Sequence, residues 1–402
     1  MCLGRGARSY SCAAPVVAPT ATVYRAGKSS CESAAMSLSR RDLLTASALL
    51  LAGPGATLRA AARDAAPSAR PMVLCWNENP YGPSPAARRA VSQAIADGCR
   101  YPTDDEIRDF TAALARHEGV SADRIVIGTG SGELLRALGL VCGADGGEII
   151  AAAPTYGELP DYAKTRGAKL KLIPVDAALR HDLSAMRAAV SGHTRAVYLC
   201  NPNNPTGTAL GAGEIGSCVG SLPPGVLTIV DEAYMDFTTL NEVRSVTELV
   251  GGRQHVVVLR TFSKIHGMAG LRCGYAIAPP DLAKTLAEAC MTTPNIFAVR
   301  AAHASLGDRT FLRDTRRRIL ASRTRLTTEL TRLKLRYAEP QGNFVFFDTG
   351  MPLKRFSDLM RERNILVGRL FEPYQSWCRI TIGTEPEVTA FLAALPAVTA
   401  HA

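Results

Sequence analysis

Residues 256–275 of this chain, VVVLRTFSKIHGMAGLRCGY, join an apolar run to a loop punctuated by glycines. The apolar run predicts a buried β-strand. The loop after it carries a single lysine, Lys264, with hydroxyls at Thr261 and Ser263 just before it and an arginine, Arg272, eight residues after it. An amine that stands alone at the end of a core strand indicates a site for an anion or a carbonyl group.

The strand pattern of this stretch recurs along the chain. From residue 125 the apolar runs IVI, GEIIAAAP, KLKLIPV, AVYLC, VLTIVDE, VVVLRT and GYAIA alternate with helical patterns such as residues 133–140 and 182–190. This alternation predicts an α/β fold whose large domain, over residues 119–300, has a mostly parallel sheet covered by helices on both faces. Ligands bind such sheets at the carboxyl ends of their strands.

A smaller α/β domain is predicted over residues 301–402. A long basic helix is followed there by the strand NFVFFD, a helix at residues 354–363, the strands ILV and CRITIGT, and a final helix. We expect residues 71–118 to supply the N-terminal part of this domain.

The formal net charge of +10 comes from 46 basic and 36 acidic residues. Residues 1–62 hold seven basic and two acidic residues, so they account for +5 of it. The basic run from Arg309 places Phe311, Leu312, Ile319 and Leu320 at helical spacing, which favours a solvated helix face over a polyanion site. No nucleic-acid partner is therefore expected.

Residues 36–62, MSLSRRDLLTASALLLAGPGATLRAAA, combine Arg40 and Arg41 with a short apolar region and a terminal A-x-A pattern. These features are typical of a twin-arginine signal peptide, so we expect the twin-arginine export machinery to carry the folded protein to the periplasm. An uncleaved signal that tethers the protein to the membrane is the alternative, although the apolar run is shorter than the roughly 20 residues of a membrane span. Residues 1–35 show no periodic pattern, and we expect translation to begin at Met36.

Eleven cysteines occur in the chain, eight of them after residue 62. They are scattered singly, without a C-x-x-C pair or a histidine pair of metal-binding spacing. We expect buried, reduced thiols and no metal site.

Polar residues stand at the ends of several predicted strands. The stretch GTGSGE places Ser131 and Gly132 in a glycine-rich turn before a helix, where backbone N–H groups and the helix dipole suit a phosphate. This turn differs from the dinucleotide-binding pattern, because Glu133 stands in the place of the last glycine.

Three further strand ends carry an aromatic ring, an amide and a carboxylate. Tyr156 follows one strand in PTY, and Asn204 lies in the proline-locked turn NPNNPTG. Asp231 ends the apolar strand VLTIVDE, where a buried carboxylate is costly unless a cation or hydrogen bonds compensate it, and Tyr234 follows. With Lys264 and the phosphate turn, these groups match the needs of pyridoxal 5'-phosphate, which a lysine binds covalently and whose ring nitrogen a carboxylate keeps protonated.

The motifs NENPYGP, RYP, GTGSGE, PTY, NPNNPTG, DEAY, TFSKIHGMAGLR and RITIGT, in this order over residues 71–395, resemble the class I/II aminotransferases of fold type I. The branch they resemble most is that of the histidinol-phosphate aminotransferases. The resemblance implies a fold type I transferase that moves an amino group between an L-amino acid, with a histidinol-phosphate-like or aromatic amine as donor, and a 2-oxo acid such as 2-oxoglutarate.

The resemblance also implies roles for individual residues. Lys264 would hold the cofactor and move the proton between the substrate Cα and the cofactor, while Asp231 would pair with the ring nitrogen. Asn204 and Tyr234 would bond the phenolic oxygen of the ring, and Tyr156 would stack on it. The residues expected to bind the cofactor phosphate are Ser131, Gly132, Thr261 or Ser263, Arg272 and, from the neighbouring subunit of a homodimer with shared sites, Tyr101.

Substrate contacts are expected from Arg379 of RITIGT, whose guanidinium would take the α-carboxylate, and also from Asn204 and Arg369. Tyr81 would either face the substrate side chain or fix the N-terminal segment. His266, beside the lysine, is an alternative base. In the histidinol-phosphate branch an arginine after the strand matching ILV contacts the substrate phosphate, but here that place is Gly368 and Arg369 comes one residue later, which puts histidinol phosphate in question.

Rival functions share parts of this pattern. A decarboxylase of amino-acid phosphates is the alternative within the same fold, because it needs the same cofactor-holding residues. A serine acyl-enzyme lacks the serine that the S-x-x-K pattern requires, since Thr261 stands there. A nicotinamide oxidoreductase would have to use the atypical turn GTGSGE, and a non-catalytic cofactor-binding module would have no need of both Lys264 and Arg379.

Overall fold

The computed structural model describes residues 70–252 and 255–400. The predicted signal peptide at 36–62 and the preceding residues 1–35 lie outside this range. Among the described residues, no helix has both the length and the apolar character needed to cross a membrane. Six of the eight described cysteines are buried, and the described cysteines form no disulfide.

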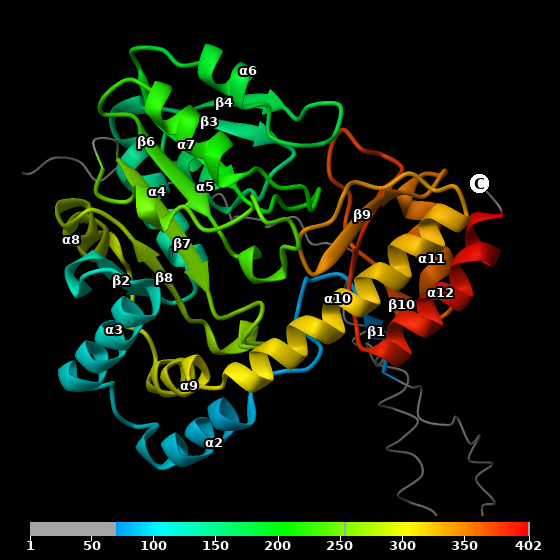
Figure 1. The fold of residues 1–402 in the computed structure, drawn as a ribbon, viewed down its shortest axis with the longest axis horizontal. Helices are drawn as coiled ribbons and strands as arrows, with labels where there is room; N and C mark the ends of the chain where they lie inside the picture. The colour runs from blue at the N-terminus through cyan, green and yellow to red at the C-terminus, as the bar shows by residue number, and fades with distance from the viewer. Residues whose placement is uncertain (1–69, 253–254, 401–402) are drawn as a thin grey trace, which may run out of the picture. The chain divides into compact units, whose positions relative to one another are not determined.

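A seven-stranded sheet organises the large domain (Figure 1). Its order is β2-β8-β7-β6-β5-β3-β4, and only β8 runs antiparallel to its neighbours. The strands are β2 (Ile125–Gly128), β3 (Glu148–Ala153), β4 (Lys169–Pro174), β5 (Thr194–Cys200), β6 (Leu227–Asp231), β7 (Val256–Thr261) and β8 (Gly274–Ile277). Each of the seven apolar runs predicts one of these strands, so the mostly parallel sheet is confirmed.

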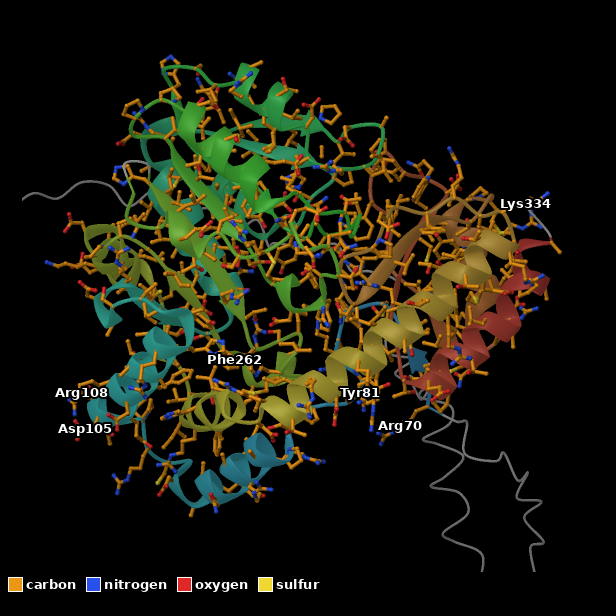
Figure 2. All side chains as sticks on the ribbon, in the orientation of Figure 1. Arg70, Tyr81, Asp105, Arg108, Phe262 and Lys334 are labelled. Carbon is orange, nitrogen blue, oxygen red and sulfur yellow. The ribbon has the colours of Figure 1, made fainter. Side chains whose placement is uncertain are left out.

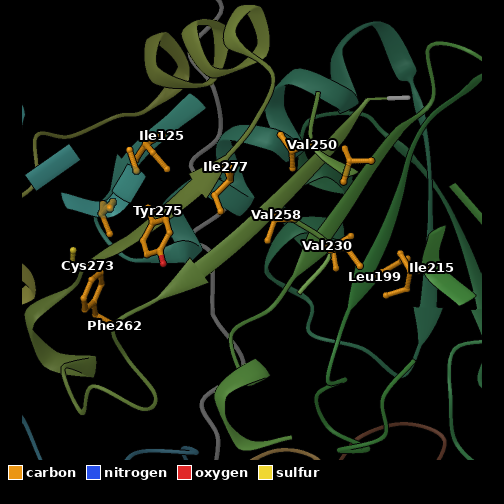
Figure 3. Close-up of a cluster of buried hydrophobic side chains, with 14 of the residues drawn as sticks. Ile125, Leu199, Ile215, Val230, Val250, Val258, Phe262, Cys273, Tyr275 and Ile277 are labelled. Carbon is orange, nitrogen blue, oxygen red and sulfur yellow. The ribbon is translucent and has the colours of Figure 1, made fainter. Parts of the chain in front are cut away.

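Helices cover both faces of this sheet because successive strand residues point to opposite sides. Val230 and Val258 lie in one buried core (Figure 3). The same core contains buried residues of α2 (Pro85–Ala94), α3 (Asp104–Glu118), α6 (Leu183–Ala188), α7 (Ala212–Ser221) and α9 (Ile296–Leu306). Ile229 and Val257, one residue away on the same strands, face α4 (Ser131–Gly143), α5 (Glu158–Thr165) and α8 (Pro280–Ala289). The inner strands β5, β6 and β7 are therefore buried on both sides, as their continuous apolar sequences predict, whereas the edge strand β4 is exposed or half-buried along its length.

Helix α3 shows how local sequence sets an element's ends. Thr103 and Glu106 form a capping box at its start, and Gly119 ends it with φ 69°, a left-handed conformation that glycine adopts readily. Acidic residues occupy its first turn and basic residues its last, which complements the helix dipole.

The smaller domain is built on α10 (Arg309–Arg332), β9 (Phe344–Asp348), α11 (Leu353–Arg361), β10 (Ile365–Leu366), β11 (Trp377–Thr381) and α12 (Glu385–Thr399). Strand β1 (Met72–Val73) pairs in parallel with β10, and the Leu74 carbonyl accepts from the Thr381 amide at 2.9 Å. Helix α10 buries Ile319 and Leu326 on one side and exposes arginines on the other, as its spacing predicts.

The N-terminal segment 71–118 is divided between the two cores, so only part of it contributes to the smaller domain. Strand β1 and Leu74 belong to the core of the smaller domain. By contrast, Ala87 of α2 and Phe110 and Leu114 of α3 are fully buried in the core of the seven-stranded sheet. The apolar faces of these two helices are matched by α9 and the sheet, a pairing that no local pattern specifies.

Candidate active site

Lys264 lies three residues beyond the end of β7, where the loop brings it to the N-terminal segment. Its Nζ donates to the Asn77 carbonyl at 2.9 Å and lies 5.4 Å from the centroid of the Tyr234 ring. Burial, with a further contribution from the positive charge of Arg379, lowers the pKa of Lys264 to about 8. An amine with such a pKa is neutral often enough near neutral pH to act as a nucleophile.

Asp231 ends β6 and is only 1% exposed. Its Oδ1 accepts from the Ala233 amide at 3.2 Å, and its Oδ2 accepts from the Tyr198 hydroxyl at 3.3 Å. No ion pair among the described residues includes Asp231, and burial raises its pKa to about 6 even though both hydrogen bonds lower it. A buried carboxylate without an ion-pair partner would be stabilised by a bound cationic group.

Tyr234, Asn204 and Arg379 form a connected polar cluster beside Lys264. Asn204 Nδ2 donates to the Tyr234 hydroxyl at 3.4 Å, and Asn77 Nδ2 donates to the same oxygen at 3.1 Å. Arg379 Nη1 donates to Asn204 Oδ1 at 2.5 Å and Nη2 donates to the Cys75 carbonyl at 2.7 Å. The chain thus brings together the segment after β1, the NPNNPTG turn, the DEAY turn and β11.

The Arg379 guanidinium is 7% exposed and lies between two aromatic rings. Its central carbon is 5.7 Å from the Phe344 ring centroid and 5.1 Å from that of Phe371. Its Nε has no hydrogen-bond partner among the described residues. A buried N–H without a partner is costly, and an anionic ligand would satisfy it.

The turn before α4 forms a cradle of backbone N–H groups. Gly130 precedes the helix with φ 82°, and a Cβ built there would meet Arg272 Nη2 at 2.5 Å. The Ser131 and Gly132 amides belong to the first turn of α4, where helical N–H groups have no partner within the helix. Arg272 itself has φ 63°, and its Nη1 donates to the Ala269 carbonyl at 2.9 Å. The N–H groups at the start of α4 and the Arg272 guanidinium are therefore both located at this turn.

The two hydroxyls before Lys264 bond each other, because Thr261 Oγ1 donates to Ser263 Oγ at 3.0 Å. Tyr156 is partly buried beyond β3, and its pKa is raised, first by burial and then by the nearby carboxylates of Glu158 and Asp231. The Tyr156 ring thus lies within electrostatic range of Asp231.

Three predicted residues, Tyr101, Tyr81 and His266, lie apart from this cluster, and Arg369 borders it through the Phe371 ring that it shares with Arg379. Tyr101 is 85% exposed. Tyr81 lies beside α10 with its ring centroid 5.3 Å from the Arg318 guanidinium, so it packs against the smaller domain (Figure 2). Arg369 is exposed and stacks on Phe371 at 4.7 Å. His266 Nδ1 lies 2.7 Å from Ser305 Oγ, and burial lowers the pKa of His266 to about 4.

Sequence reasoning missed several residues that complete the cluster. Asn77 contacts both Lys264 and Tyr234. It belongs to the motif NENPYGP, in which only Tyr81 was predicted to be a site residue. Tyr198 and Phe371 lie in apolar or unfamiliar stretches that carry no local sign of a site. Their contribution depends on which strands become neighbours.

The chain matches the family model described as aminotransferase class I and II over residues 69–395. It belongs to this family. The enzyme is 36% identical over 330 residues to a histidinol-phosphate aminotransferase of Moorella thermoacetica, covering 81% of this chain and 84% of the relative. It is 37% identical over 324 residues to an aromatic amino acid aminotransferase of Rhodococcus jostii, covering 80% of this chain and 88% of the relative.

A solved structure of histidinol-phosphate aminotransferase from Sinorhizobium meliloti, in complex with pyridoxal 5'-phosphate, superposes on this aminotransferase with a TM-score of 0.76. The two chains are 28% identical, and the match covers 83% of this chain and 92% of the other. The predictions of a fold type I aminotransferase and of its pyridoxal phosphate cofactor are confirmed. The residues present fit the cofactor: the buried Asp231 lacks a cation partner, the Arg272 guanidinium lies against the Gly130 turn, and Lys264 is a partly buried amine with a lowered pKa.

Proposed function

We propose that this aminotransferase transfers the amino group of an L-amino acid with an aromatic side chain to a 2-oxo acid. The observation that carries the proposal is the Arg379 guanidinium, which keeps one buried N–H unpaired and lies between the rings of Phe344 and Phe371. Such a group binds a carboxylate. An aromatic donor is supported by the likeness to the aromatic amino acid aminotransferase and by the lack of a side chain at residue 368.

The residue at position 368 supports an aromatic donor, because the histidinol-phosphate branch has an arginine at this place and this chain has a glycine. Gly368 donates its amide to the Arg379 carbonyl, and a Cβ at Gly368 would lie 2.3 Å from that carbonyl oxygen. No side chain fits there without a backbone shift. The next residue, Arg369, is exposed and stacks on the face of Phe371. The phosphate contact expected in that branch therefore has no counterpart at residue 368.

The chain's own residues account for the chemistry around the cofactor. Pyridoxal phosphate, when bound, supplies an aldehyde that links to amines and a ring that accepts electrons. We propose that Ser131, Gly132, Arg272 and the hydroxyls of Thr261 and Ser263 hold its phosphate. Asp231 holds a proton at the ring nitrogen, and Tyr156 packs on the ring face.

Two further groups act at the reacting side of the ring. Tyr234 and Asn204 direct hydrogen-bonding groups to its phenolic oxygen. Lys264, whose lowered pKa lets it exchange protons near neutral pH, accepts the proton from the substrate Cα and delivers it to the cofactor. Arg379 holds the carboxylate so that this proton lies toward Lys264.

The test is a single-turnover absorbance measurement with the cofactor-loaded enzyme, mixed in turn with an aromatic amino acid, glutamate and histidinol phosphate. We expect the absorbance band of the bound cofactor to disappear with the aromatic donor and a 2-oxo acid to be released, with no carbon dioxide. Loss of the band only with histidinol phosphate would overturn the substrate assignment. Release of carbon dioxide would favour the decarboxylase alternative.

We propose a homodimer in which Tyr101 reaches the cofactor phosphate of the neighbouring subunit, in keeping with its 85% exposure. The test mixes two inactive variants, Tyr101→Phe and Lys264→Ala. A mixed dimer contains one site with both native residues, so activity should return on mixing. If each variant stays inactive after subunit exchange, Tyr101 does not act across the interface.

We also propose export by the twin-arginine route, which residues 36–62 support by composition and order. Changing both Arg40 and Arg41 to lysine should keep the protein in the cytoplasm, as measured by cell fractionation. Equal periplasmic amounts of the wild type and this variant would contradict the proposal.

A further inference from the structure

Tyr198 lies near the end of β5 and its side chain is fully buried in the sheet face that α4 and α5 cover. Strands β5 and β6 are parallel neighbours in which Cys200 pairs with Asp231. Tyr198 stands two residues before Cys200, so its side chain and that of Cys200 lie on the same face. This register brings the Tyr198 hydroxyl to 3.3 Å from Asp231 Oδ2.

Within the described residues, the Tyr198 hydroxyl is the only side chain that donates to Asp231. The other donor is the Ala233 amide, which bonds Oδ1. Burial favours the protonated form of Asp231 and the negative charge of Glu232 acts in the same direction, whereas the Tyr198 hydroxyl favours the ionised form. The hydroxyl also engages one carboxylate oxygen from the side of the sheet, which restricts rotation of the Asp231 side chain.

We propose that Tyr198 is a positioning residue that keeps Asp231 ionised and oriented toward the ring nitrogen of the cofactor. The inference rests on the role proposed for Asp231. Tyr198 contacts neither substrate nor the reacting atoms and acts through the carboxylate alone. The hydroxyl is required, while the ring serves as packing.

Tyr275 offers a matched control for the substitution Tyr198→Phe. It is also a buried tyrosine of the same sheet, 5% exposed, and its hydroxyl donates to a carboxylate, that of Glu118. Its side chain lies in the core on the opposite face of the sheet. Tyr198→Phe and Tyr275→Phe therefore remove the same atom from similar surroundings, and only the first affects Asp231.

The experiment measures dissociation constants of the two variants and the wild type for pyridoxal phosphate and for an analogue with carbon in place of the ring nitrogen. Because a hydrogen bond to a charged group is among the stronger ones, Tyr198→Phe should raise the dissociation constant of pyridoxal phosphate by about tenfold or more. Its effect on the analogue should stay within about twofold of the wild type, since the analogue has no ring nitrogen to pair with Asp231. Tyr275→Phe should leave both constants unchanged.

Two results would overturn the proposal. Equal weakening of both cofactor forms by Tyr198→Phe would mean a general structural role, as would equal weakening by the two variants. Thermal unfolding of the cofactor-free proteins shows whether each variant is folded, and turnover should fall in kcat rather than rise in KM for Tyr198→Phe only. Failure of the wild type to transaminate any aromatic donor would refute the proposed function but leave the two-cofactor comparison intact.

Discussion

Replacing Asp231 with asparagine removes the buried titratable charge of the site while nearly conserving its shape. The pKa of Asp231 is about 6 in the folded protein, against an ordinary value of 3.8. The difference of about two pH units, at about 1.36 kcal/mol per unit, means that the ionised carboxylate lowers the free energy of unfolding by about 3 kcal/mol at a pH well above 6. Since the side chain is 1% exposed, solvent screens little of this.

The sign follows from proton binding. A carboxylate whose pKa is raised on folding binds more protons in the folded state, so its contribution to stability is full below its ordinary pKa of 3.8 and is lost as the pH rises through about 6. Between about pH 8 and pH 5 the cofactor-free wild type should therefore gain about 1 kcal/mol from this group, while the asparagine variant gains nothing from it. We expect the variant to have its largest stability advantage at the higher pH.

Denaturant unfolding of both cofactor-free proteins at about pH 8 and pH 5 measures this difference. All other titrating groups cancel when the variant and the wild type are compared at each pH. The gap between their free energies of unfolding should shrink by about 1 kcal/mol on acidification. A gap that stays constant, or that widens at low pH, would refute the account of Asp231 as a carboxylate penalised by burial. Pyridoxal phosphate should stabilise the wild type more than the variant.

Lys264→Arg should abolish the covalent attachment of the cofactor and lower turnover about a thousandfold. After treatment with borohydride, the mass of the wild-type protein should include the cofactor and that of the variant should not. Arg379→Lys loses the planar fork and should raise KM for the amino donor about tenfold or more, with a smaller effect on kcat. Gly130→Ala places a Cβ 2.5 Å from Arg272 Nη2 at a positive φ and should weaken cofactor binding in equilibrium dialysis. Gly368→Ala places a Cβ 2.3 Å from the Arg379 carbonyl oxygen and should lower the free energy of unfolding by about 1–3 kcal/mol.

Gly216→Ala is a control for the two glycine substitutions. A Cβ at Gly216, inside α7, meets no atom within 4 Å, so alanine should be neutral or stabilising there. Wild-type stability in Gly368→Ala would show that the backbone at this point yields easily and that a side chain can be accommodated. Retained cofactor mass in Lys264→Arg would mean that another amine forms the bond.

The strands and the motifs at their ends were readable from the sequence because both are local. Seven apolar runs of the right length and spacing predict the seven strands, and the general rule for α/β sheets gathers Asp231, Asn204 and Lys264 at one edge. The order of the motifs also predicts the family and the cofactor. These features depend on residue types within a few positions of one another.

The smaller domain was readable only in part. Its helices and strands follow local patterns, but α2 and α3, which precede the large domain, pack on the large sheet through Ala87 and Phe110. An amphipathic helix shows that it has an apolar face without showing which surface will cover it. That choice depends on the complementary surfaces of α9 and the sheet, which are distant in sequence.

Tertiary structure alone decided how the site is completed. The Asn77 contact with Lys264 spans 187 residues, and the hydrogen bond between Arg379 and Asn204 spans 175. Tyr198 reads as one more apolar position in a strand until the register of β5 and β6 puts its hydroxyl on Asp231. Sequence determined which chemical groups were present and at which end of the sheet, because strand periodicity and turn residues act locally. The partners of those groups were decided by packing between distant segments, because hydrogen bonds form across whichever surfaces the folded cores bring into contact.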